Sequence, residues 1–223
     1  MSQDFLNRIE ERIEVRSLLK HPFYQAWQEG KLTKEELKVY AAQYYHFESA
    51  FPVYLSSVHS RCDERDVRQS ILENLWDEEH GDINHRAMWL DFCESLGLNR
   101  EEPEMTKPLT NTQALLDTYH TICNEGTFQE GLAAIYAYEE QVPEIMIEKI
   151  RGLKEYFNIT SEKALRFFEV HSVLDEDHSD REREGIVGYT KRTDEKAVER
   201  SLQAALDGWW GFLDGVMEES RAA

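Results

Sequence analysis

Cysteine and basic residues are scarce in this chain, and each shortage excludes a class of protein. The 223 residues include three cysteines, Cys62, Cys93 and Cys123, which are widely spaced and form no Cys-x-x-Cys pair. Neither a disulfide framework nor a thiolate metal site is therefore indicated, and a reducing cytoplasm is the expected compartment. The 25 basic residues against 44 acidic ones give a formal net charge of −19, which repels nucleic-acid phosphates and anionic lipid. We expect neither nucleic acid nor a membrane as a partner.

Long apolar runs are also missing. No stretch is apolar for about 20 residues, as a membrane span requires, and the start of the chain lacks the basic and apolar regions of a secretory signal. We therefore expect a soluble cytoplasmic protein. Strand-like alternation, heptads and internal repeats are absent as well. The length suits one domain, so residues 1–223 are predicted to form a single all-α bundle of seven or eight helices.

Apolar residues at helical spacing predict where these helices lie. Pro52 falls inside one of them and is expected to kink or break it, because its ring removes a backbone donor and crowds the preceding turn. Residues 99–110, with two prolines, are predicted to be a loop. The predicted helices cover residues 6–15, 21–27, 33–59, 66–96, 111–124 and 127–158, a segment capped by Thr160 or Ser161, and a last helix from Thr193 or Asp194.

Three polar residues in the segment after Ser161 follow one another at i, i+4 and i+7: His171, Asp175 and His178. With about 3.6 residues per turn, they project from one face of a helix. A buried carboxylate between two imidazoles must be paired or bound to a metal. Metal ligation meets that need, but a solvated polar stripe is the other interpretation, and this segment alone does not decide between them.

Two further segments carry candidate ligands. Glu78 and His85 are seven residues apart, which places them two turns apart on one face of the predicted helix 66–96, although their charged neighbours favour an exposed face. Glu139 follows the apolar run 131–138, which delivers it to a packed interior where an isolated carboxylate is costly. Together the three histidines and three carboxylates suit two first-row metal ions, iron or manganese rather than thiolate-bound zinc. The repeated Glu-x-x-His of ferritin-like proteins is not found.

This ordered set, with its helix-sized separations, resembles the ligand pattern of the haem-oxygenase-like di-metal oxidases and, within them, of the CADD-like proteins. The resemblance extends over nearly the whole chain and is carried by Glu78-x6-His85, Glu139 and His171-x3-Asp175-x2-His178. It implies a seven-helix bundle around a dinuclear centre of iron with iron or iron with manganese. That centre uses dioxygen and a reductant and contains no haem. The resemblance also implies formation of para-aminobenzoate for folate synthesis.

The same resemblance gives roles to four further residues. Tyr24, in a His-Pro-Phe-Tyr segment, is similar to the tyrosine that CADD-like proteins use as their own substrate. Tyr40 and Tyr138 are similar to auxiliary tyrosines of the site. Lys149, ten residues after Glu139, matches the lysine that donates the amino nitrogen. An oxidising metal centre can attack a tyrosine ring, and a lysine near a metal can lose its proton.

Ordinary structural roles for these four residues stay open. The three tyrosines fit core aromatics, and Lys149 fits an exposed helix charge. At about 100° per residue, Lys149 points well away from the direction of Glu139. Pro143 would have to bend the helix, or the long lysine side chain would have to reach round it.

Three other functions also stay open. A relative of the same fold could oxidise a separate small molecule, such as a fatty acid or an amine, with Tyr24 only a wall of the pocket. A metal-free thiaminase-like or cofactor-biosynthesis relative would not need all six ligand positions. A protein-interaction module, which the family's name suggests, does not require carboxylates and histidines inside a bundle. The electron donor stays unidentified, and Trp209 and Trp210 either form a homodimer contact or cap the core.

Overall fold

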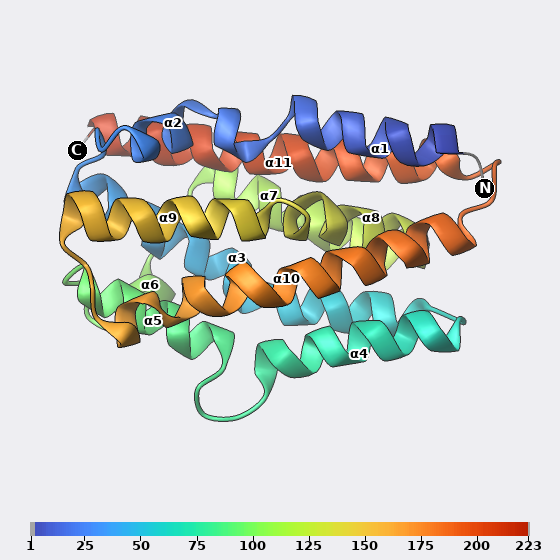
Figure 1. Cartoon of the computed structure of the whole chain (residues 1–223), viewed down its shortest axis with the longest axis horizontal. Helices are drawn as coiled ribbons and strands as arrows, with labels where there is room; N and C mark the ends of the chain where they lie inside the picture. Colours follow the sequence, from blue (N-terminus) through green and yellow to red (C-terminus); the bar gives the residue numbers. More distant parts are fainter. Residues whose placement is uncertain (1–2, 223) are drawn as a thin grey trace.

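A computed structural model describes residues 3–222 as a helical bundle, with no strand in that range (Figure 1). The all-α prediction is confirmed. The bundle consists of α1 (Gln3–Val15), a 3-10 turn (Leu18–Lys20), α2 (Pro22–Gln28), α3 (Lys34–Arg61), α4 (Arg65–Glu79), α5 (His85–Ser95), α6 (Glu102–Met105), α7 (Thr110–Glu125), α8 (Phe128–Glu139), α9 (Val142–Phe157), α10 (Glu162–Tyr189) and α11 (Glu195–Ala222).

Hydroxyl side chains begin three of the helices, among them α10, for which the sequence predicted a cap at Thr160 or Ser161. Thr33 and Thr127 each accept a hydrogen bond from the backbone three residues later, and the glutamates at those positions bond back to complete capping boxes. Ser161 accepts from the backbone of Ala164 and begins α10. These bonds satisfy backbone donors that have no partner inside the helix.

We expected Pro52 to kink or break its helix, and it does not break α3. The helix runs without interruption from Lys34 to Arg61, with Pro52 inside it. Residues on both sides of the proline, including Phe51 and Leu55, are buried in the core. This packing of both halves stabilises the continuous helix in spite of the missing backbone hydrogen bond.

Two predicted helices are each divided into two. Residues 66–96 form α4 and α5, because residues 80–84 leave the helix, with Gly81 at a φ of +81° and Asn84 capping α5. Residues 127–158 form α8 and α9, with the break at 140–141 and Pro143 in the first turn of α9. The predicted loop 99–110 contains the short helix α6. These breaks explain why the structure has more helices than the seven or eight predicted.

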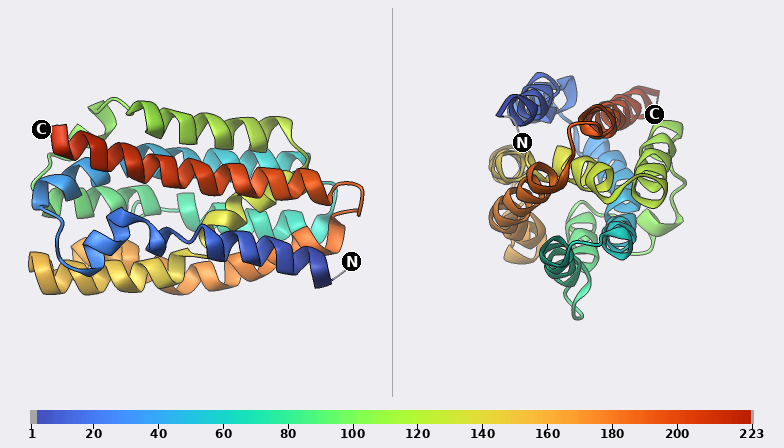
Figure 2. Two further views of the ribbon diagram at one scale, coloured as in Figure 1. Left: turned by 90° about the horizontal axis from the view of Figure 1, so that it is seen from above. Right: turned by 90° about the vertical axis from the view of Figure 1, so that its right-hand side faces the viewer.

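The long helices lie roughly along one axis, and the two views in Figure 2 show α1 and α2 beside α11 on one side of the bundle. Arg8 pairs with Glu195 and Glu199 across the contact between α1 and α11, at 2.7 Å for each pair. Trp209 is 2% exposed and stacks on Tyr138, so it belongs to the core rather than to a dimer surface. Within residues 3–222, no helix is both long enough and apolar enough to cross a membrane.

Candidate metal centre

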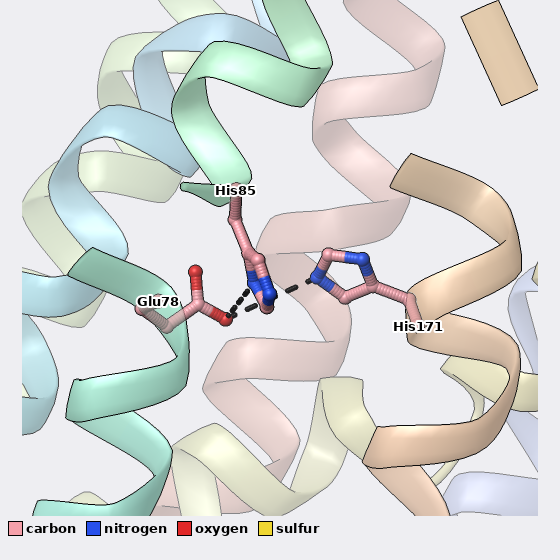
Figure 3. A group of neighbouring side chains, drawn as sticks. All are labelled: Glu78, His85 and His171. Carbon is pink, nitrogen blue, oxygen red and sulfur yellow. Dashed lines mark ion pairs between the residues drawn. The ribbon is translucent and has the colours of Figure 1, made fainter. Parts of the chain in front are cut away.

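The first group of predicted ligands joins three helices: Glu78 from α4, His85 from α5 and His171 from α10 (Figure 3). All three side chains are buried, and one ligand atom of each lies within 4.8 Å of the others. The Oε1 atom of Glu78 is 2.9 Å from Nδ1 of His85 and 3.9 Å from Nε2 of His171. A carboxylate and two imidazoles therefore converge on one point inside the bundle.

The way Glu78 and His85 meet differs from the prediction. We expected one continuous helix to carry both on one face, but Glu78 lies in the last turn of α4 and His85 is the first residue of α5. Figure 3 shows the two side chains pointing toward each other across the break between the helices. Their closeness thus depends on the turn around Gly81, not on helical phase.

The second group consists of Glu139 from α8 and Asp175 and His178 from α10. Its three ligand atoms also lie within 4.8 Å of one another, and all three residues are buried. Asp175 Oδ1 is 3.8 Å from Nδ1 of His178. Asn74 of α4 donates its amide to both oxygens of Glu139, at 3.1 and 3.2 Å, which fixes the orientation of this carboxylate.

Two of the histidines are held so that one ring nitrogen points into the centre. His171 Nδ1 lies 2.8 Å from the backbone oxygen of Phe167, which leaves Nε2 facing Glu78. His178 Nε2 lies 3.3 Å from Asp77, while its Nδ1 is buried and has no hydrogen-bond partner. Metal-binding histidines commonly use their second nitrogen in this manner.

Burial and neighbouring charges shift the pKa values of residues in both groups. Loss of water, together with the nearby Glu139 and Glu78 charges, raises the pKa of Asp175 well above its usual range. Burial alone would lower the pKa of His85, but the Glu78 carboxylate beside it raises the value to about 9. Carboxylates buried this deeply require a positive partner. The oxygen and nitrogen atoms of the six residues fit two first-row metal ions, one in each group.

Lys149 is fully buried, so the interpretation as an exposed helix charge is wrong. Because α8 ends at Glu139 and α9 begins at Val142, the helical phase of Lys149 is independent of Glu139. The objection from helix geometry therefore does not apply. Burial lowers the pKa of Lys149 to about 7, and Glu48 partly opposes that shift. Its Nζ atom has no hydrogen-bond partner.

Aromatic rings surround this nitrogen on several sides. The distances from Nζ to the ring centres are 5.7 Å for Tyr24, 5.2 Å for Tyr40, 5.3 Å for Tyr44, 6.0 Å for Trp89 and 5.8 Å for Phe168. We call these five rings the lysine cage. Such rings exclude water and leave the amine close to two of the three tyrosines that the sequence singled out.

The third tyrosine, Tyr138, joins the lysine cage through Tyr44, whose hydroxyl lies 2.6 Å from its own. Tyr24 and Tyr40 are likewise in contact, with their hydroxyl oxygens 3.3 Å apart. Phe167 lies between the cage and the first ligand group, with ring centres 6.2 Å from Tyr44 and 4.0 Å from His171. The tyrosines and the ligand groups thus belong to one continuous core.

Sequence reasoning missed several polar residues of this region. Glu48 and Glu182 are buried carboxylates, and each has one oxygen without a hydrogen-bond partner. Spacing offered a signal for both, since Glu48 is four residues after Tyr44 and Glu182 is four residues after His178. Asn74 offered the same signal, since it is four residues before Glu78, but its contact with Glu139 depends on how α4 packs in the bundle.

Comparisons of sequence find one family profile and several relatives that match most of the chain. The profile of a family described as "Iron-containing redox enzyme" matches residues 38–210. The chain is 40% identical over 216 residues to a 4-aminobenzoate synthase of Chlamydia pneumoniae, covering 97% of this chain and 96% of that protein. It is 39% identical to a 4-aminobenzoate synthase of Nitrosomonas europaea, covering 96% of this chain and 91% of that protein.

Comparisons of structure show the same fold in more distant proteins. A CADD-like protein of Nostoc punctiforme has a TM-score of 0.80 at 16% identity, with 98% of this chain and 99% of that chain covered. A domain of Shewanella denitrificans with a heme oxygenase-like fold has a TM-score of 0.81 at 20% identity, with 98% and 92% covered. At these identities the likeness concerns the fold alone.

Proposed function

Because the chain belongs to the family of iron-containing redox enzymes and has the haem-oxygenase-like fold, we propose that it is an oxygen-dependent di-metal oxidase that forms 4-aminobenzoate. The names of relatives at 38–40% identity over nearly the whole chain support this product. The observation that carries the proposal is the pair of buried ligand groups beside a buried, unpartnered lysine. The proposed reaction does not involve haem.

The six residues Glu78, His85, Glu139, His171, Asp175 and His178 would hold the two metal ions. We propose iron in one group and either iron or manganese in the other. When bound, these ions supply the activation of dioxygen, with electrons from an external reductant. The protein's own residues hold the ligands in place and keep the surroundings dry.

We further propose that Tyr24 is the substrate. In 4-aminobenzoate a carboxyl group and an amino group stand opposite each other on a benzene ring. A tyrosine side chain has the same ring, with a carbon atom opposite its hydroxyl. The ring of Tyr24 would become the ring of the product, its Cβ would become the carboxyl carbon as the bond to Cα breaks, and an amine would replace the hydroxyl.

Lys149 is our proposed source of that amine. Its Nζ would bond to the ring carbon that carries the hydroxyl, the hydroxyl oxygen would leave as water, and the bond between Nζ and Cε would break as Cε is oxidised to an aldehyde at the expense of dioxygen. The Nζ atom lies 5.7 Å from the centre of the Tyr24 ring, and burial favours the uncharged form, which has the free electron pair that an amine needs to attack. Tyr40 and Tyr138 would act as auxiliary residues that hold the reacting groups, through the hydroxyl contact of Tyr40 with Tyr24 and of Tyr138 with Tyr44.

A reconstitution experiment tests this function. The apoprotein receives iron, with or without manganese, and then a reductant and oxygen, without added tyrosine or chorismate. We expect release of 4-aminobenzoate, no more than about one molecule per chain, and a mass loss confined to the peptide that contains Tyr24. Isotope-labelled tyrosine in the protein should label the product ring.

Two results would replace this proposal with an oxidase acting on an external small molecule. One is many turnovers on an added substrate with Tyr24 intact. The other is full product yield from Tyr24→Phe, which keeps the ring packing and loses only the hydroxyl. Metal analysis of His171→Ala separates the metal assignment from the choice of substrate, since a full complement of two metals in that variant would exclude His171 as a ligand.

A further inference from the structure

Glu182 adjoins the second ligand group and has no role in the function proposed above. It lies one helical turn beyond His178 on α10, so it continues the face that carries Asp175 and His178. The side chain is 5% exposed and is hydrogen-bonded to the carboxyl group of Glu139. Its Oε2 atom is buried and has no hydrogen-bond partner.

Acidic side chains predominate among the described neighbours of Glu182. Glu139, Asp175 and Glu182 bring three carboxyl groups into the same buried region as one imidazole, that of His178. In the part of the chain that the structure describes, no lysine or arginine forms an ion pair with any of the three. Removing carboxylates from water is costly unless opposite charge accompanies them. A divalent cation between these groups would supply it.

We propose that Glu182 is a fourth protein ligand of the metal ion held by Glu139, Asp175 and His178. The inference rests on the proposed ligand set of this second group, and not on the identity of the product. Iron and manganese sites with oxygen ligands are typically octahedral, so three protein atoms leave coordination positions open. The unpartnered Oε2 atom of Glu182 is an additional carboxylate donor beside Glu139.

A fourth ligand would make the two groups chemically unequal. The second group would offer three carboxylates and one imidazole, whereas the first offers one carboxylate and two imidazoles. Carboxylate oxygens suit manganese and imidazole suits iron. Glu48 is another buried carboxyl group of this core, but its hydrogen bond is to Tyr44 and not to a predicted ligand. The second group is therefore the manganese-preferring one.

Titration of the full-length apoprotein with Mn²⁺ tests the proposal, with free Mn²⁺ followed by its electron paramagnetic resonance signal. In Glu182→Gln we expect manganese affinity at one of the two sites to fall by at least about 10-fold, while the other site is unchanged. Glu184→Gln makes the same charge change at an exposed position two residues away and should bind manganese like the parent protein. Undiminished affinity in Glu182→Gln would overturn the proposal.

Two further measurements distinguish direct ligation by Glu182 from a positioning role and from misfolding. A crystal structure of the manganese-loaded protein, with anomalous scattering to locate the ions, should show a Glu182 oxygen bound to the second ion. A second ion bound only by Glu139, Asp175 and His178 would overturn the proposal and leave Glu182 as a positioning residue.

If Glu182→Gln folds poorly by circular dichroism, Glu182→Asp keeps the charge, withdraws the carboxylate by one methylene, and should lose affinity in the same site. Parent protein that binds fewer than two ions would instead overturn the dinuclear centre itself.

Discussion

The side-chain nitrogen of Lys149 lies 5.7 Å from the centre of the Tyr24 ring, inside a core that gives it no hydrogen-bond partner. A buried donor without a partner costs about 1–3 kcal/mol. The fold therefore retains a lysine at a position where an apolar residue of similar length would be more stable. A buried amine that destabilises the fold and lies close to a tyrosine ring is typical of a functional site rather than of core packing.

Lys149→Met should accordingly stabilise the protein while removing amination. The methionine side chain has a similar length and needs no partner, so we expect the free energy of unfolding to rise by about 1–3 kcal/mol. Denaturant unfolding measures that change, and metal analysis should still find two ions per chain. Product release should fall below detection in this variant and in Lys149→Arg, which keeps the charge but supplies no transferable primary amine. Undiminished product from either one would exclude Lys149 as the donor.

Product formation should depend on pH through the same lysine. The folded pKa of Lys149 is about 7, below its ordinary value of about 10.4, so the reactive uncharged amine becomes more abundant as pH rises through about 7. Between these two values the unfolded chain binds the extra proton, so this group's contribution to stability also increases with pH. Yield measured after a fixed short time should rise with pH around a midpoint near 7.

Glu48→Gln provides the matched control for that profile. The Glu48 carboxylate raises the pKa of Lys149, whereas burial raises the pKa of Glu48 itself to about 8, so only the ionised fraction of Glu48 acts near pH 7. Glu48→Gln should therefore move the midpoint to lower pH by a small amount. A midpoint that moves to higher pH would contradict this effect of Glu48 on Lys149.

The sequence predicted the residues of the candidate site better than it predicted where the surrounding helices begin and end. The order and spacing of the six residues were sufficient to select them but not to divide them between two sites. The structure places His171 with Glu78 and His85, and it places Asp175 and His178 with Glu139. The direction in which the Lys149 side chain points could not be derived from the sequence, because the break at 140–141 starts a new helix with its own register. Pro143 is compatible both with the first turn of a new helix and with a kink in a continuous one, and the sequence does not distinguish the two.

The missed carboxylates have a different cause. Glu48 and Glu182 follow Tyr44 and His178 at helical spacing, but 44 acidic residues in the chain make such coincidences common. Only tertiary burial distinguishes these two from the exposed acids around them. Pro52 shows the same dependence on packing, since the flanking core contacts and not the local sequence decide that α3 continues.

Asp77→Asn should weaken metal binding in the second group without removing a predicted ligand. Asp77 lies 3.3 Å from Nε2 of His178, and a carboxylate in that position orients the imidazole and makes its other nitrogen a better donor. We expect affinity for one metal ion to fall by about 10- to 100-fold, measured by titration of the apoprotein. Glu79→Gln removes a neighbouring exposed charge and should leave affinity unchanged. Equal affinities in the two variants would contradict this role for Asp77.

Gly152→Ala should move α9, which carries Lys149, away from α2, which carries Tyr24. A Cβ atom at Gly152 of α9 would lie 2.5 Å from Nε1 of Trp27 in α2, and Trp27 packs against Tyr24 at a ring-centre distance of 6.4 Å. We expect the free energy of unfolding to fall by about 1–3 kcal/mol, because the indole must move, and we expect product yield to fall with it. Gly211→Ala is the control, since its added Cβ meets nothing within 4 Å in the middle of α11 and should stabilise the helix by about 0.5–1 kcal/mol. If Gly152→Ala lost stability but kept the parent yield per folded chain, the close approach of α9 to α2 would serve packing alone.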